Sequence, residues 1–115
     1  MEKTFLQGEI WLVRLDPTEG AEIKKTRPCL IVSRDKINEK LNPVTIVPFS
    51  SGITDKSILL INTPASKMNG LKTDSHLVLP QIRTIAKHRC MKRFGVLEKS
   101  FVPLLKRSFQ LYFWS

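Results

Sequence analysis

Hydrophobic residues along this chain occur in short runs, which polar residues, Gly and Pro interrupt. Runs of about four to eight apolar residues between turn-forming residues are typical of β-strands. We therefore expect strands over residues 10–13, 29–32, 45–47, 58–61, 77–79, 82–85 and 94–97. Pro28 precedes the second strand, and Pro80 separates the fifth from the sixth. Residues 35–41 are expected to form one helical turn with Asp35 as its cap.

The C-terminal part has a different pattern. From Ser100 onwards the apolar positions recur near helical spacing, at Phe101, Leu104, Leu105, Phe109, Leu111 and Tyr112. Ser100 is expected to cap this helix, and Pro103 falls in its first turn, where a missing N–H is tolerated. Many short strands followed by one helix predict a mainly β fold: a compact barrel with a C-terminal α-helix, in a single domain over residues 1–115. The apolar tail 111–114 needs a cover, either the barrel or a second copy of the chain.

Length and composition indicate a small folded domain. A chain of 115 residues buries roughly two-thirds of its unfolded surface and needs neither disulfides nor a metal to be stable. No apolar run approaches the ~18 residues of a membrane-spanning helix, and the first residues lack the apolar stretch of a signal peptide. Two cysteines, Cys29 and Cys90, are too few for a disulfide framework. We expect a soluble cytoplasmic protein that does not bind membranes.

Positive charge is concentrated in the second half of the chain. The formal net charge is +9. Residues 1–60 hold nine Lys and Arg against eight Asp and Glu, whereas residues 61–115 hold ten against two. The segment 83–93 contains no acidic residue. Because Lys and Arg gain affinity for phosphates by releasing counterions, this pattern favours a nucleic acid or an acidic protein as partner.

Few residues offer chemistry. His76 and His88 are the two histidines, which gives thin support for a two-histidine acid–base nuclease. No spacing of His, Cys, Asp and Glu resembles a metal site, and no Gly-rich phosphate loop occurs, so we expect no metal and no cofactor. Arg27 stands before Pro28 and is held in extended backbone. Its guanidinium either meets a phosphate in fixed geometry or pairs with an acidic residue to pin the loop before it.

Three motifs, in order, are similar to those of the MazF/PemK/Kid toxins. The first covers residues 8–22 (GEIWLVRLDPTEGAE) together with 26–33 (TRPCLIVS), the second is VPFSS at 47–51 and the third is QIRTI at 81–85. The resemblance extends over nearly the whole chain. It implies an SH3-like barrel of the MazF/PemK/CcdB type that forms a homodimer.

The same resemblance implies an endoribonuclease toxin of a type II toxin–antitoxin system. Such a toxin cleaves single-stranded RNA at short sequences without a metal or the ribosome. The ribose 2′-OH attacks the adjacent phosphate and leaves a 2′,3′-cyclic phosphate and a 5′-OH. The implied protein partner is an antitoxin whose acidic C-terminal segment occupies the RNA groove.

Site residues follow from matching positions. Arg27 matches the family's catalytic arginine, Glu22 matches an acid beside the site, and either Ser50 or Ser51 takes the place of the family's catalytic threonine. The residues expected to bind RNA are Lys25, Thr26, Gln81 and Arg83, with Lys87 and Arg89 added from the basic segment.

The chain also departs from the family pattern. Pro80 replaces an acid that many relatives carry, and Val78 and Ala21 stand where Kid-type toxins have Arg and His. The general base is therefore unassigned. Two alternatives remain open: a CcdB-like inhibitor of DNA gyrase that binds through the C-terminal Trp114, and a catalytically inactive barrel that binds RNA or the antitoxin.

Overall fold

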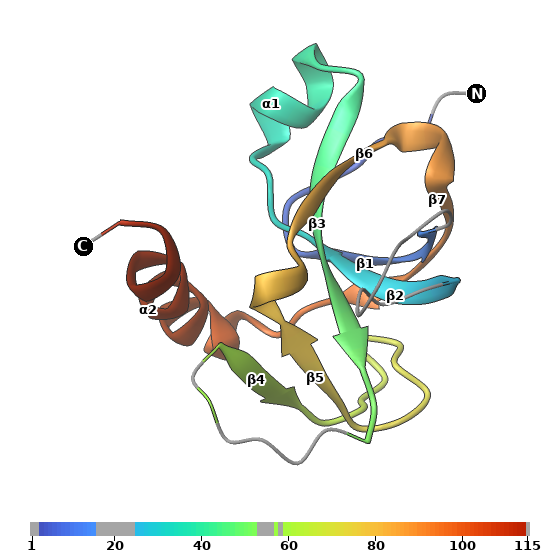
Figure 1. Ribbon diagram of the computed structural model, residues 1–115. Coiled ribbons are helices and arrows are strands. Elements are labelled where there is room, and N and C mark those ends of the chain that lie inside the picture. The colour runs from blue at the N-terminus through green and yellow to red at the C-terminus, as the bar shows by residue number, and fades with distance from the viewer. Residues whose placement is uncertain (1–2, 16–24, 53–56, 58, 115) are drawn as a thin grey trace.

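The fold is an antiparallel β-sheet that curls into a barrel and carries a helix at its C-terminal end (Figure 1). The computed structural model describes residues 3–15, 25–52, 57 and 59–114. Within them lie β1 (Glu9–Arg14), β2 (Thr26–Ile31), β3 (Pro43–Ser50), β4 (Leu60–Thr63), β5 (Ser75–Val78), β6 (Arg83–Ala86) and β7 (Cys90–Val96). The helices are α1 (Asp35–Lys40) and α2 (Val102–Phe113), with 3-10 turns η1 (Leu79–Gln81), η2 (Lys87–Arg89) and η3 (Lys99–Phe101). The predicted mainly β class with a C-terminal helix is confirmed.

Strand β3 organises the sheet. The strand order is β4-β5-β3-β2-β1-β7, and β6 pairs with β3 outside this path. Along its length β3 pairs with β6 through residues 43–46, with β2 through residues 46–48 and with β5 through residues 49–50. The C-terminal end of β3 therefore lies where the barrel strands meet the β4–β5 hairpin.

Two hydrophobic cores cover the two faces of the sheet. Cys29, Ile31 and Ile46 belong to the core inside the barrel, whereas Leu30 and Val47 belong to the core on the opposite face. This alternation is the period of two that a strand imposes, and strands with two buried faces read as continuous apolar runs. The prediction of buried strands at 29–32 and 45–47 is thereby confirmed to within two or three residues at their ends.

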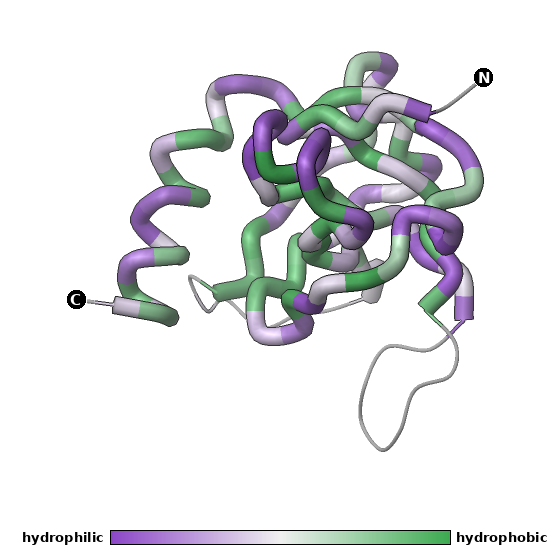
Figure 2. The backbone as a smooth tube through the Cα atoms, turned by 90° about the horizontal axis from the view of Figure 1, so that it is seen from above, coloured by the Kyte–Doolittle hydropathy of each residue, from purple (hydrophilic) through white to green (hydrophobic). Residues whose placement is uncertain are grey.

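Helix α2 covers the second core only in part. Its residues Leu105 and Phe109 pack against that core, and Figure 2 shows hydrophobic bands alternating with polar ones along the helix. At its C-terminal end Tyr112 is 42% exposed, Phe113 is 53% exposed and Trp114 is 84% exposed. The described part of the barrel therefore does not cover the apolar tail. None of the described helices has the length and apolar character needed to cross a lipid bilayer.

Two expected helix caps are wrong. Asp35 is the first residue of α1 rather than its cap, and its Oδ1 accepts a hydrogen bond from the backbone N–H of Gln7 at 2.7 Å. Ser100 lies inside η3, which leads directly into α2 with Phe101 at the cap position and no side-chain cap. The carboxylate of Asp35 is thus used to hold the N-terminal segment. Pro103 does lie in the first turn of α2, as predicted.

Several strand limits also differ from expectation. β2 begins at Thr26, so Arg27 and Pro28 lie inside the strand. Pro28 is tolerated there because β2 pairs with β3 only from Cys29 onwards, which leaves Pro28 with one neighbouring strand. β7 begins at Cys90 rather than Phe94, since its charged middle pairs with β1 and hides the apolar pattern. β4 and β5 are each shifted by about two residues, and Ile58 lies outside the described residues.

The loop between β4 and β5, residues 64–74, is tied closely to the start of the C-terminal segment. Asn69 is fully buried, and its side chain donates to the Pro64 carbonyl at 2.9 Å and accepts from the backbone N–H groups of Ser66 and Leu71. Glu98 accepts a 2.6 Å hydrogen bond from Ser66 Oγ and a 3.3 Å bond from Asn69 Nδ2. These bonds give the loop one defined shape.

Acid is expected to loosen this loop. Burial works to raise the pKa of Glu98, but the hydrogen bonds from Ser66, from its own backbone and from Asn69 outweigh it, and the pKa lies below its usual 4.5. A carboxyl with a lowered folded-state pKa stabilises the protein above its unfolded pKa, and this contribution is lost as pH falls through the folded value. We expect the melting temperature to fall more steeply between about pH 5 and 3 in the wild type than in Glu98→Gln. A Glu39→Gln control on α1 should behave as wild type, and an unchanged slope in Glu98→Gln would contradict this account.

Candidate functional site

Two arginines from different strands converge on one end of the barrel. Arg27 is half-buried on β2, two residues before Cys29, and therefore lies on the same face of the strand. Arg83 begins β6, opposite Ile46 of β3. Burial raises the pKa of the Cys29 thiol far above its ordinary value and nearby Cys90 adds to the rise, whereas the positive charges of Arg83 and Arg27 oppose it. Both guanidinium groups are therefore close enough to Cys29 to influence its thiol. Two neighbouring guanidinium groups favour binding of a phosphate.

Arg83 is also fixed through the backbone. Its Nη1 donates to the carbonyl of Leu15 at 3.3 Å, and Leu15 follows directly after β1. Leu15 in turn donates its backbone N–H to the carbonyl of Lys25 at 2.8 Å. The arginine pair is thus built on the base of the segment that joins β1 to β2, whose residues 16–24, with Glu22 and Ala21 among them, lie outside the described residues.

The two candidate serines have different surroundings. Ser50 ends β3 two residues beyond Pro48, which lies directly opposite Cys29. Because side chains two apart on a strand share a face, Ser50 is on the same side of the sheet as Cys29 and the arginine pair. Ser51 follows the strand and lines a pocket of about 220 Å³ together with Arg27. The structure therefore separates Ser50 from Ser51, which the sequence alone does not.

A histidine faces Ser50. His76 of β5 is paired directly with Ser50 of β3 and, on its other side, with Asn62 of β4. Side chains directly opposite each other on antiparallel strands lie about 4.5–5.5 Å apart at Cβ. An imidazole, whose ring nitrogens can donate or accept a hydrogen bond, thus neighbours the hydroxyl. The sequence alone offers only thin support for His76 as an acid–base group, and the β3–β5 register is what puts it beside Ser50.

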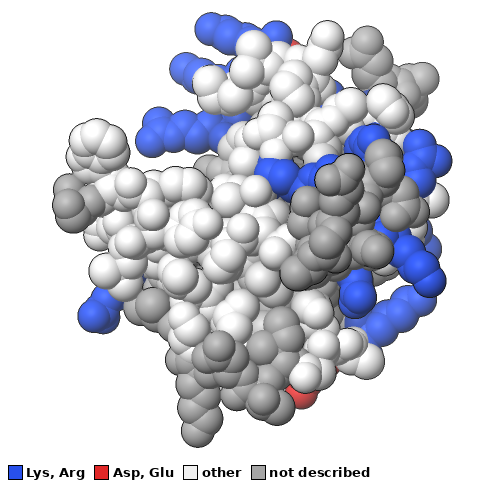
Figure 3. All heavy atoms as spheres, in the orientation of Figure 1, with Lys and Arg blue, Asp and Glu red and all other residues white. Residues whose placement is uncertain are grey.

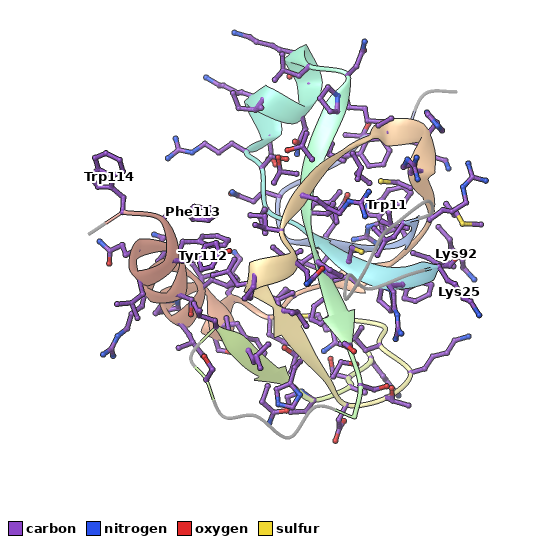
Figure 4. The ribbon with its side chains drawn as sticks, viewed as in Figure 1. Trp11, Lys25, Lys92, Tyr112, Phe113 and Trp114 are labelled. Atoms are coloured by element: carbon purple, nitrogen blue, oxygen red, sulfur yellow. The ribbon has the colours of Figure 1, made fainter. Side chains whose placement is uncertain are left out.

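The basic residues do not form one cluster. Figure 3 shows Lys and Arg side chains near α1 and along the edge formed by β2 and β7, with little acidic surface on this face. Figure 4 shows Lys25 and Lys92 at that edge. Arg89 Nη1 donates to the Arg14 carbonyl at 3.2 Å, and Arg14 pairs with Thr26. Lys87 instead donates to the carbonyl of Asn38 in α1.

The remaining predicted positions lie as follows. Thr26 and Lys25 are exposed at the start of β2, and Lys25 has a positive φ of 66°. Gln81 is half-buried in η1, two residues before Arg83. The structure therefore places Lys25, Thr26 and Arg89 beside the β1 and β2 ends near the arginine pair, and Lys87 beside α1.

Arg89 and Lys87 are expected to contribute unequally to RNA binding. Replacing Arg89 by Gln should weaken RNA affinity and lower the magnitude of the salt slope by about one, because it removes a cation beside the β2 end. Lys87→Gln should have a smaller effect, because Lys87 lies beside α1 and away from the arginine pair. Affinity measured against salt concentration tests this. Equal slopes in the two variants would contradict the separation of the basic residues, and a changed cut site in either would contradict a sequence-neutral phosphate contact.

The site contains no evident metal ligands. Among residues 3–15, 25–52, 57 and 59–114, no group of three or more His, Cys, Asp and Glu could hold an ion. His88 is exposed in η2 and lines a depression with Lys87 and Lys40. Cys90 is buried, and burial raises the pKa of its thiol to about 11. Neither His88 nor the cysteines offer a nucleophile or an acid–base group at the arginine pair.

The described groups define a class of site. Two guanidinium groups, a hydroxyl and an imidazole at the end of a small barrel suit the binding of a phosphodiester and the stabilisation of charge that develops on its oxygens. Comparison with known proteins agrees with a site of this class. The chain belongs to the PemK-like, MazF-like toxins of type II toxin–antitoxin systems, whose family model matches residues 6–113.

Individual relatives support this assignment. The chain is 31% identical over 116 residues to endoribonuclease MazF9 of Mycobacterium tuberculosis, covering 95% of this chain and 98% of the relative. The fold superposes on the Mycobacterium tuberculosis toxin MazF-mt6 with a TM-score of 0.77 and 25% identity, covering 91% and 95% of the two chains. It also matches a mycobacterial endoribonuclease solved in complex with its cognate antitoxin, with a TM-score of 0.73 and 15% identity over 96% and 93% of the chains. This last likeness concerns the fold.

Proposed function

We propose that this chain is the toxin of a type II toxin–antitoxin system and an endoribonuclease that cuts single-stranded RNA at short sequences. The observation that supports this most is the location of Arg27, Arg83 and Ser50 on one face of the sheet, by the registers of β3 with β2 and β6. Relatives of the same length are named endoribonucleases. On this proposal residues 1–115 act as one toxin domain in the cytoplasm, where mRNA is available.

The proposed reaction is attack of a ribose 2′-oxygen on the adjacent phosphorus. The new P–O2′ bond forms as the P–O5′ bond breaks, which leaves a 2′,3′-cyclic phosphate and a 5′-OH. Arg27 stabilises the charge that builds on the phosphate oxygens, because a planar guanidinium donates two parallel hydrogen bonds to them. Ser50 donates a third hydrogen bond to the same phosphate, and Arg83 holds the strand in the groove. Glu22, which lies outside the described residues, matches an acid that either orients Arg27 or accepts a proton.

The proton of the 2′-OH needs an acceptor. Arg27 is a poor base because a guanidinium stays protonated in proteins. Val78 and Pro80, at the positions where relatives carry ionisable groups, cannot take a proton. Among the described residues we assign this step to the imidazole of His76, which faces Ser50 across the β3–β5 pair. Water protonates the 5′-oxygen as it leaves.

The proposed partners follow from charge and from exposed apolar surface. An antitoxin with an acidic C-terminal segment would compete with RNA for the basic edge near Lys25, Thr26 and Arg89. Gln81 would line the same groove. A second copy of the chain would cover the aromatic end of α2, where Tyr112, Phe113 and Trp114 are exposed (Figure 4). Both partners are proposals for this chain.

The two serines provide a matched pair of variants. Ser50→Ala should lower kcat by about ten- to a hundred-fold, since it removes a hydrogen bond that strengthens as charge develops on the phosphate. Ser51→Ala should leave kcat within about three-fold of wild type, because Ser51 lines the neighbouring pocket instead. Single-turnover cleavage of one RNA substrate measures both. The reverse order of effects would move the catalytic hydroxyl to Ser51.

Incubation of the purified protein with a long RNA in the presence of EDTA tests the class of function. The proposal predicts cuts at one short sequence by the wild type and none by Arg27→Ala. Intact RNA together with inhibited gyrase supercoiling would instead support the alternative that binds through Trp114. Intact RNA that is nevertheless bound tightly would support the inactive barrel.

A further inference from the structure

The pocket lined by Arg27 and Ser51 also contains residues that have no role in the proposed cleavage chemistry. Its volume of about 220 Å³ is below the ~300–1,000 Å³ of sites for drug-sized ligands. Its lining combines apolar and polar residues. The apolar ones are Leu12, Pro28, Phe49, Leu71 and Phe94. The polar ones are Arg27, Ser51, Lys72, Thr73 and Ser75. We propose that this pocket holds one unstacked nucleobase of the RNA, next to the scissile phosphate, and reads its edge.

Two of the polar lining residues, Lys72 and Thr73, come from the loop 64–74. This loop lies against β7 because two glycines allow the backbones to approach. A Cβ on Gly70, whose φ is 70°, would lie 2.2 Å from the Phe94 carbonyl oxygen, and a Cβ on Gly95 would lie 2.2 Å from the Met68 carbonyl oxygen. The backbone N–H of Val96 donates to that same Met68 oxygen at 2.9 Å.

The result is a rigid wall. The buried side chain of Asn69 fixes the turn from within, and Leu71 is buried beneath the loop. Lys72 and Thr73, directly after it, are exposed at the pocket. A site that must distinguish one base from another needs its polar groups held in place, because a mobile donor adapts to the wrong partner.

The chemistry of the lining matches a nucleobase better than it matches a sugar or a phosphate. Single-stranded RNA is recognised by stacking an unstacked base on aromatic or apolar side chains and by hydrogen bonds to its edge. Half-buried Phe94 offers the ring. In the described part of the chain, no hydrogen bond to another residue occupies Thr73 Oγ1 or Ser51 Oγ. Ser75 Oγ donates to the Thr73 carbonyl at 2.9 Å and keeps its acceptor capacity.

Cations stand where the backbone of that nucleotide would pass. Arg27 borders both the pocket and the barrel end at which phosphate chemistry is proposed. Lys72 stands on the loop that forms the other wall. A base seated between them would have one flanking phosphate near Arg27 and the other near Lys72. The inference therefore rests on the proposed function and adds the residues that select the base.

Cleavage of an RNA pool with a randomised segment, followed by sequencing of the fragment ends, tests the assignment. Thr73→Val removes one hydroxyl and keeps the shape of the side chain. It should relax the base preference by about five-fold at a single position of the cut site, as expected for one hydrogen bond, and leave the other positions unchanged. Thr4→Val, exposed in the N-terminal segment, is the control and should keep the wild-type profile.

Lys72 is tested by affinity. Lys72→Gln should lower the magnitude of the salt slope of RNA binding by about one and leave the preference intact, whereas Lys67→Gln, on the same loop but outside the pocket lining, should change neither. Wild-type profiles and slopes in both pocket variants, with the wild type active, would overturn the pocket assignment and leave the nuclease standing. Equal inactivity of wild type and Arg27→Ala would refute the proposed function, and the pocket assignment with it.

Discussion

Arg27→Lys is expected to lower kcat/KM for RNA cleavage by about a hundred-fold or more, although it keeps the positive charge. An ammonium is a point charge, and it cannot make the two parallel hydrogen bonds that a guanidinium makes to a phosphate. Removing one preorganised donor to developing negative charge typically lowers kcat by about 10²–10³. Initial rates on one defined RNA substrate measure the effect.

Arg107→Lys is the matched control for this variant, because Arg107 is exposed on α2. Its rate should equal that of the wild type. The Arg27→Lys and Arg107→Lys variants should both melt at the wild-type temperature. Arg27 is only half-buried, and the aliphatic part of a Lys side chain can occupy the same space as that of Arg. Near-normal cleavage by Arg27→Lys would mean that Arg27 supplies charge alone, and the bidentate assignment would then be wrong.

His76→Gln is expected to lower kcat by about a hundred-fold or more, the range usual for loss of a positioned general base. KM should stay close to the wild-type value, because the substitution removes a group that acts only as the transition state forms. Initial rates on one defined RNA substrate measure both. The groups paired with His76 on the neighbouring strands are Ser50 and Asn62, and both are uncharged.

His88→Gln separates this prediction from a general effect of losing a histidine. His88 is exposed in η2 beside Lys87, away from the arginine pair. Its variant should keep the wild-type kcat. A wild-type kcat in His76→Gln would contradict the assignment of His76 as the base.

The sequence predicts the architecture well because the strands and the C-terminal helix have hydrophobic patterns that can be recognised in the sequence itself. Runs such as 29–32 and 45–47 are buried on both faces, so their apolar character is visible without any knowledge of their partners. The helical spacing after Ser100 is similarly explicit. The wrong predictions concern the ends of helices and strands. Asp35 and Ser100, for example, have the residue types of caps, but a contact with Gln7 and a 3-10 turn decide their surroundings.

The site is only partly predictable, for a different reason. Arg27, Arg83 and the two serines carry motif signals. The pairing of Ser50 with His76 depends on the register between β3 and β5, which are separated by the β4 hairpin strand and a long loop. Thr73 and Lys72 reach the pocket because Gly70 and Gly95 bring the loop onto β7. The sequence shows Asn69-Gly70 as a turn, and gives no sign of which surface that turn lies against.

The chemistry of the cleaved ends tests the central proposal most directly. RNA is incubated with the protein in EDTA, and the fragments are analysed for their termini. The proposed attack by the 2′-oxygen predicts a 2′,3′-cyclic phosphate on one fragment and a 5′-OH on the other. It also predicts that a substrate with a 2′-deoxyribose at the cut position remains intact. Fragments with 5′-phosphate ends, or cleavage of the deoxyribose substrate, would show that water attacks the phosphorus and would contradict this account of Arg27, Ser50 and His76.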